Sequence, residues 1–148
     1  MATITPPNRT TTGTDTEQSL ANPFFQAFVL LRIGFTVAPI LFGLDKFAHV
    51  LVNWDKYLAP QIADALPGNA HQLMNVVGVI EIVAGLAVAV RPRFGGYLVA
   101  AWLTGIIVNL LVVADYYDVA LRDFGLLLGA LTLARLAYAF DRKHTASA

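Results

Sequence analysis

The feature that most constrains the fold of this chain is an uncharged apolar stretch of 21 residues, from Phe94 to Ala114. An α-helix rises about 1.5 Å per residue, so a stretch of this length crosses the roughly 30 Å of hydrocarbon in a lipid bilayer. A helix of a soluble bundle would instead show a polar face. The stretch therefore predicts a membrane-spanning helix.

Three further apolar stretches predict helices of the same kind. Of the 148 residues, 57% are hydrophobic and 14% are charged, whereas an ordinary soluble domain has about 25% charged residues. We expect an all-α integral membrane four-helix bundle with up-down topology. The expected helices cover about 24–48, 71–90, 94–114 and 119–140.

The two ends of the chain differ from this four-helix domain, which we place at 23–140. Residues 1–22 are rich in threonine and carry Pro6 and Pro7, which is typical of a disordered polar tail. Residues 141–148 form a second, shorter polar tail. A secretory signal would need a basic start followed directly by an apolar stretch, and the sequence lacks that pattern.

The distribution of positive charge predicts the orientation in the membrane. The link between the second and third helices carries Arg91 and Arg93, and further basic residues follow the fourth helix, whereas the link at 115–123 is mainly acidic. Positively charged loops stay in the cytoplasm. We therefore expect a multi-pass protein of the cell (plasma or inner) membrane with both termini cytoplasmic. Trp54 and Tyr57 predict a short interfacial segment in the first outward connection.

Composition also excludes several functions. The absence of cysteine rules out disulfides, a thiolate nucleophile and cysteine-bound iron–sulfur clusters within this chain. Ten basic residues balance ten acidic ones, so a nucleic-acid partner is not expected. The three histidines follow no metal-binding spacing, and we expect no metal site.

Two buried charges are the first candidates for function, because ionisable groups at membrane depth are costly and usually functional. Arg32 and Glu81 each lie about eight or nine residues from the cytoplasmic ends of their helices, so at equal depth. We expect them to form an ion pair. Two interpretations stay open: a pair that only locks two helices together, or part of a pocket for a quinone head, a proton or a small polar substrate.

Under the pocket interpretation, Glu81 is the acceptor and Arg32 its counter-ion, and further polar residues share the same helix faces. Small residues let membrane helices approach closely, so the glycines on the same helix faces are expected to lie at contacts between helices. The expected pocket comprises Arg32, Thr36, Lys46, Glu81 and Asn109, and the packing glycines are Gly43, Gly78, Gly85, Gly105, Gly125 and Gly129. No catalytic residue is assigned.

The same segments resemble the DoxX family of small four-helix membrane proteins over about residues 26–140. The resemblance is carried by LLRIGF at 30–35, FGLDKF at 42–47, GVIEIVAGLAVAV at 78–90 and GGYLVAAWL at 95–103. It implies a four-helix bundle linked to membrane redox chemistry, because the family takes its name from a thiosulfate:quinone oxidoreductase. Any thiol or sulfane chemistry would belong to a partner, since this chain has no cysteine.

Two classes of function remain open. In the first, the protein is a membrane subunit or anchor of a quinone-linked redox system, in contact with membrane lipid and with a soluble or membrane oxidoreductase subunit. The resemblance implies quinone as the cofactor in that case. In the second, it is a small-molecule transporter or a structural membrane protein without redox activity. The sequence leaves open whether it is an enzyme and whether it forms a homo-oligomer.

Overall fold

The structure is a computed structural model, and it describes residues 22–51, 53–60, 64 and 67–146. The described residues form helices and connections, with no strand, which confirms the all-helical prediction for this part of the chain. The elements are α2 (Pro23–Ala48), the short 3-10 helix η1 (Trp54–Tyr57), α4 (Ala70–Val90), α5 (Pro92–Val113) and α6 (Tyr117–Ala146).

Local sequence signals explain where these helices begin. Asn22 caps α2 by accepting a hydrogen bond from the Phe24 amide, and Pro23 occupies the first helical position, where its missing N–H costs nothing. The side chain of Asn69 caps α4 together with Gln72 in a reciprocal capping box. Pro92 begins α5 directly after α4 ends, so only Arg91 separates the two helices.

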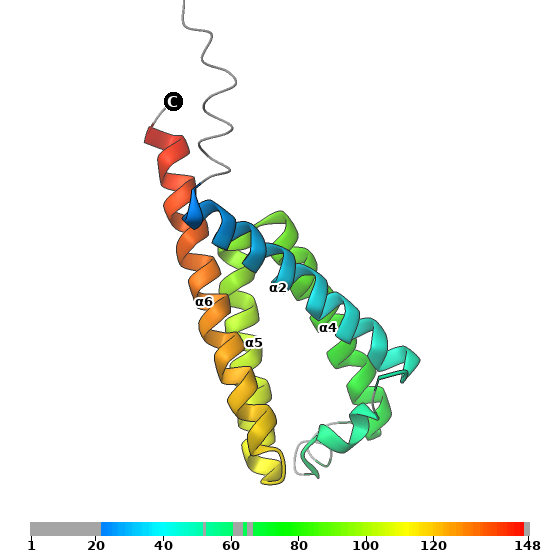
Figure 1. The fold of residues 1–148 in the computed structure, drawn as a ribbon. Coiled ribbons are helices and arrows are strands. Elements are labelled where there is room, and N and C mark those ends of the chain that lie inside the picture. The colour runs from blue at the N-terminus through cyan, green and yellow to red at the C-terminus, as the bar shows by residue number, and fades with distance from the viewer. Residues whose placement is uncertain (1–21, 52, 61–63, 65–66, 147–148) are drawn as a thin grey trace, which may run out of the picture.

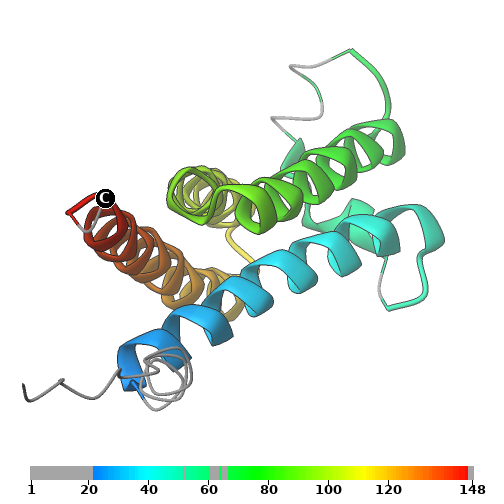
Figure 2. The same ribbon diagram turned by 90° about the horizontal axis from the view of Figure 1, so that it is seen from above.

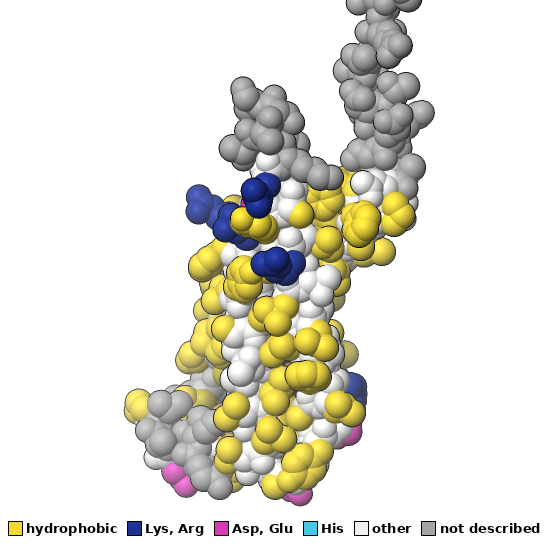
Figure 3. Space-filling view, turned by 90° about the vertical axis from the view of Figure 1, so that its left-hand side faces the viewer, with side chains coloured by type: hydrophobic (Ala, Val, Ile, Leu, Met, Phe, Trp, Pro, Cys, Tyr) yellow, Lys and Arg dark blue, Asp and Glu magenta, His cyan; other side chains and the backbone are white. Residues whose placement is uncertain are grey.

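Three helices are long and apolar enough to cross a membrane, namely Pro23–Ala48, His71–Val90 and Pro92–Val113. Large apolar side chains cover their outer surfaces; Leu30, for example, is 71% exposed. Figure 3 shows apolar side chains along the length of one face, with basic side chains gathered toward one end and acidic ones toward the other. Contiguous apolar surface of this kind marks a membrane-embedded protein.

The helices associate in two pairs (Figure 1). α2 packs chiefly against α4, and α5 packs chiefly against α6. The pairs meet near the α4–α5 turn and diverge toward the other end, where η1 lies (Figures 1 and 2). The apolar core lies where α4, α5 and α6 meet; it comprises Ala84, Val88, Val99, Ala100, Leu103, Ala130 and Leu133.

Two glycine contacts fix the register of α2 against α4. A Cβ added at Gly43 would lie 2.6 Å from the carbonyl oxygen of Gly78, and one added at Gly85 would lie 2.8 Å from that of Thr36. The backbones of α2 and α4 therefore touch at both positions, and only glycine permits so close an approach here. Gly129 also lies at a helix contact, because a Cβ there would lie 3.1 Å from the ring of Phe35.

The structure corrects two predictions about packing and boundaries and leaves a third untested. Gly105 and Gly125 face open space in the described structure, so their assignment as packing glycines was wrong. α6 continues to Ala146, so most of the expected C-terminal tail is helical. The tail expected at 1–22 lies outside the described residues, apart from the helix cap Asn22.

Glycine substitutions test the α2–α4 contact. We expect Gly43→Ala to lower the free energy of unfolding in detergent by about 1–3 kcal/mol, because the new methyl group overlaps the Gly78 carbonyl and forces the helices apart. Gly105→Ala is the matched control; it replaces a helical glycine that faces open space and should leave stability unchanged or raise it. Equal effects of the two substitutions would contradict the close contact.

Candidate functional site: a buried lysine–glutamate pair

A buried ion pair joins α2 to α4. Lys46 Nζ donates a hydrogen bond to Glu81 Oε2 at 2.7 Å, and the two side chains are 5% and 11% exposed. Lys46 stands one helical turn beyond Gly43, and Glu81 stands one turn beyond Gly78. Because α2 and α4 run antiparallel, these two turns lie on opposite sides of the glycine contact. Lys46 Cβ packs against Gly78, and the long lysine side chain reaches from there along α4 to Glu81.

An aromatic and acidic cluster surrounds the ammonium group of Lys46. The Trp54 ring of η1 lies 3.9 Å from Nζ, which is a cation–π contact. The Trp54 indole donates a hydrogen bond to Asp45 Oδ2 at 2.7 Å. Asp45 Oδ1 accepts from the amides of Val50 and Leu51, each at 3.0 Å. Asp45 thus holds the chain after α2 in the turn that places Trp54 over the ion pair.

The second helix pair completes the site. Trp102 of α5 and Asp123 of α6 both interact electrostatically with the Glu81 carboxylate. The indole nitrogen of Trp102 is buried without a hydrogen-bond partner. All four long helices therefore contribute a polar group around one buried carboxylate, and the Trp102 indole faces that carboxylate without a hydrogen bond close enough to satisfy it.

The predicted Arg32–Glu81 ion pair was wrong. Arg32 donates from its guanidinium group to the carbonyl oxygen of Ala89, close to the end of α4, and it lies 6.0 Å from the Phe28 ring centroid. A cation is favourable there, because the last carbonyls of a helix are unpaired and carry partial negative charge. Arg32 therefore neutralises a helix end rather than the buried carboxylate.

The predicted pair requires the start of the first helix and the end of the second, which are their two cytoplasmic ends, to lie at the same level. The glycine contacts set Gly43 against Gly78 and Thr36 against Gly85, so each step along α2 matches a step back along α4. This register brings Arg32 to the level of Ala89, roughly 12 Å along the axis from Glu81. The sequence alone does not show how far two packed helices are shifted along their axes or how they are tilted against each other.

Two other residues expected in the pocket lie elsewhere. The Asn109 amide nitrogen donates to the Tyr57 carbonyl at 2.7 Å, and its oxygen accepts from the Ala59 amide at 2.9 Å. Asn109 thus fastens the η1 segment to α5. Thr36 lies at the Gly85 contact, ten residues from Lys46, which is about 15 Å along α2. Of the five expected pocket residues, the structure brings together Lys46 and Glu81.

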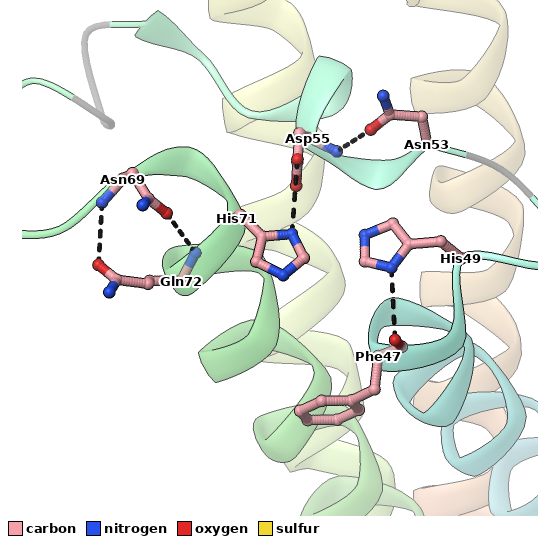
Figure 4. Close-up of polar contacts among 7 residues, drawn as sticks. All are labelled: Phe47, His49, Asn53, Asp55, Asn69, His71 and Gln72. Atoms are coloured by element: carbon pink, nitrogen blue, oxygen red, sulfur yellow. Dashed lines mark hydrogen bonds and ion pairs between the residues drawn. The ribbon is translucent and has the colours of Figure 1, made fainter.

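A second polar cluster lies at the same end of the bundle, and the sequence did not predict it. His49, at the C-terminal end of α2, stacks against His71 of α4 with ring centroids 5.0 Å apart, and Asp55 of η1 lies beside them (Figure 4). These three residues lie on or beside the connection between α2 and α4, and their spacing matches no metal-binding motif. Only the folding of the connection between α2 and α4 brings them together.

Comparison with family models, with curated proteins and with solved structures gives no match. The resemblance to the DoxX family therefore stays a prediction from the quoted segments.

Charge deletion tests the ion pair. We expect Lys46→Met to lower the free energy of unfolding by about 3–5 kcal/mol, because it leaves a buried carboxylate without its counter-ion. The double substitution Lys46→Met with Glu81→Leu should recover much of the lost stability, because it removes the buried carboxylate as well. Stability is measured by denaturant titration in detergent micelles.

Two controls accompany this measurement. Arg122→Ala breaks an exposed Arg122–Asp118 pair, which should have little effect. Arg32→Ala combined with Glu81→Gln should show additive losses, because the two side chains have different partners. Additive losses for Lys46 and Glu81 would contradict the pair.

Proposed function

We propose that this chain is a DoxX-like membrane subunit or anchor of a quinone-linked redox system, with the Lys46–Glu81 site as its quinone-binding region. One observation carries the proposal: two of the four segments that carry the resemblance, 42–47 and 78–90, supply both members of the buried ion pair. A buried charged pair at membrane depth is costly, and such groups usually mark a functional site.

The proposal includes four crossings in up-down order. α6 has 30 residues, or about 45 Å of helix, and it packs along α5. It exposes large apolar side chains, among them Leu121, Phe124 and Leu128, as the three apolar helices do. Its charged Arg122 and Asp123 lie near its start, at the level of the bilayer surface in this arrangement.

The groups at the site suit a quinone head. Reduction of a quinone to a quinol takes up two electrons and two protons. Lys46 and the unpartnered Trp102 indole offer hydrogen-bond donors to quinone carbonyls, and Glu81 offers an acceptor for a quinol hydroxyl or a proton. The electrons would come from an oxidoreductase partner, because a chain without cysteine holds no iron–sulfur cluster through thiolates.

We place the protein in the cell membrane with both termini in the cytoplasm. This orientation rests on the basic residues Arg91, Arg93 and Arg142. It agrees with the gathering of basic side chains toward one end, and of acidic ones toward the other, on the face in Figure 3. The η1 segment then lies on the outer side.

Tryptophan fluorescence tests quinone binding directly. Trp54 and Trp102 are the chain's two tryptophans, and both lie at the site. We expect a short-chain quinone to quench their fluorescence saturably in nanodiscs, and Lys46→Met to weaken binding by at least about tenfold, the loss expected for one charged hydrogen bond. Arg122→Ala, in an exposed pair, should change nothing.

Two outcomes would overturn this proposal. The first is quenching that does not saturate, or that is equal in wild type and Lys46→Met. The second is the absence of both quinone and an oxidoreductase from protein purified gently from its own membrane. A substrate-dependent flux into proteoliposomes that Glu81→Gln abolishes would instead support the transporter alternative.

Single cysteines test the orientation, because the chain has none of its own. In intact cells a membrane-impermeant maleimide should label Lys56→Cys and Asp118→Cys, and it should reach Arg91→Cys and Ser147→Cys only after lysis. Ala59 is unsuitable because it is fully buried. Labelling of Arg91→Cys before lysis would reverse the orientation, and labelling of Lys56→Cys without Asp118→Cys would contradict the four crossings.

A further inference from the structure

We propose that His49, Asp55 and His71 form a binding site for a divalent transition-metal ion such as Zn²⁺. One ligand atom from each residue lies within 4.8 Å of the other two, and His71 Nδ1 lies 3.7 Å from Asp55 Oδ2. Ligands in a tetrahedral zinc site lie about 3.4 Å apart, given zinc–ligand bonds of about 2.0–2.1 Å. Small side-chain rotations therefore bring all three atoms to coordination distance.

Two unpartnered polar atoms support this site. His49 Nε2 and Asp55 Oδ1 are both buried without a hydrogen-bond partner. Such atoms are costly in a folded protein unless something binds them. In Figure 4 this nitrogen of His49 lies on the side of the ring that faces His71 and Asp55. A cation between the three side chains would satisfy both atoms at once.

The hydrogen bonding of His49 also suits a metal ligand. Its Nδ1 lies 3.4 Å from the carbonyl oxygen of Phe47. When Nδ1 carries the proton it donates to that oxygen, and the lone pair of Nε2 is then free. Histidine ligands commonly have their second nitrogen held by a carbonyl or carboxylate in this way.

The donor set indicates the class of ion. Two imidazole nitrogens and one carboxylate oxygen suit zinc and other first-row transition metals, whereas calcium takes six to eight oxygen ligands. Three protein ligands leave a fourth position for water. The His71 side chain is 54% exposed, so ions reach the site from solvent.

Binding would link three parts of the chain. His49 follows α2, Asp55 lies in η1, and His71 lies in the first turn of α4. The neighbouring Trp54 covers Lys46, so an ion held by Asp55 would also hold the η1 segment over the buried pair. The metal site does not depend on the proposed quinone function.

Calorimetry with Zn²⁺ tests the site in the full chain, purified in detergent through a tag without histidine. We expect one ion per chain, with affinity reduced at least about tenfold in His49→Ala and in His71→Ala, since outer-shell changes alone cost 10–100-fold. Asp55→Asn should also weaken binding. His144→Ala is the matched control and should bind as wild type does, because His144 lies at the far end of α6.

A second measurement needs no variant. Co²⁺ added to the wild type should give the intense visible absorption of a four-coordinate site, and an excess of Zn²⁺ should abolish it. Absence of both the calorimetric signal and the cobalt spectrum at protein concentrations of about 100 μM would overturn the proposal, since specific sites bind more tightly than this. Binding that persists unchanged in His49→Ala and His71→Ala would overturn it as well.

Discussion

The arrangement of this bundle depends on one interaction, the ion pair between Lys46 and Glu81 inside a largely apolar assembly. Moving either charge out of water alone costs several kcal/mol, and only close pairing with further polar contacts offsets that cost. The contacts are present: the ammonium touches both the carboxylate and the face of Trp54. Well-packed apolar residues often serve stability equally well, so the presence of a buried pair does not by itself distinguish a helix-locking contact from a binding site.

The backbone provides the geometry that this pair needs. Gly43 and Gly78 let α2 and α4 touch, which places Lys46 against Gly78, and the lysine side chain then reaches Glu81 on the next turn of α4. The connection between α2 and α4 adds the remaining polar contacts. Asp45 orders the chain after α2, Trp54 covers Lys46, and Asn109 fastens the segment to α5. The ion pair thus depends both on the register between α2 and α4 and on the folded connection between these two helices. This dependence explains why a short polar connection is folded onto the bundle.

Much of the fold could be predicted from the sequence, because apolar stretches such as Phe94–Ala114 satisfy the length and composition of a membrane helix by themselves. The site was predicted only in part. Buried charges were recognisable as such, but their pairing depends on the relative level of α2 and α4, which tight glycine contacts decide. The sequence therefore predicts a pair between Arg32 and Glu81, whereas the structure pairs Glu81 with Lys46. His49 and His71 meet only through the fold of the connection between α2 and α4, and no spacing in the sequence shows that contact.

The most direct test of this account is the distance between the lysine nitrogen and the glutamate carboxyl carbon, measured by solid-state NMR in lipid bilayers. Isotope labels on the lysine Nζ and glutamate Cδ atoms suffice, because the chain has only two glutamates, Glu17 and Glu81. The account predicts dipolar coupling that corresponds to about 4 Å or less, as a direct hydrogen bond requires, and its loss in Lys46→Met. No coupling in the wild type, or coupling that survives in Lys46→Met, would contradict it.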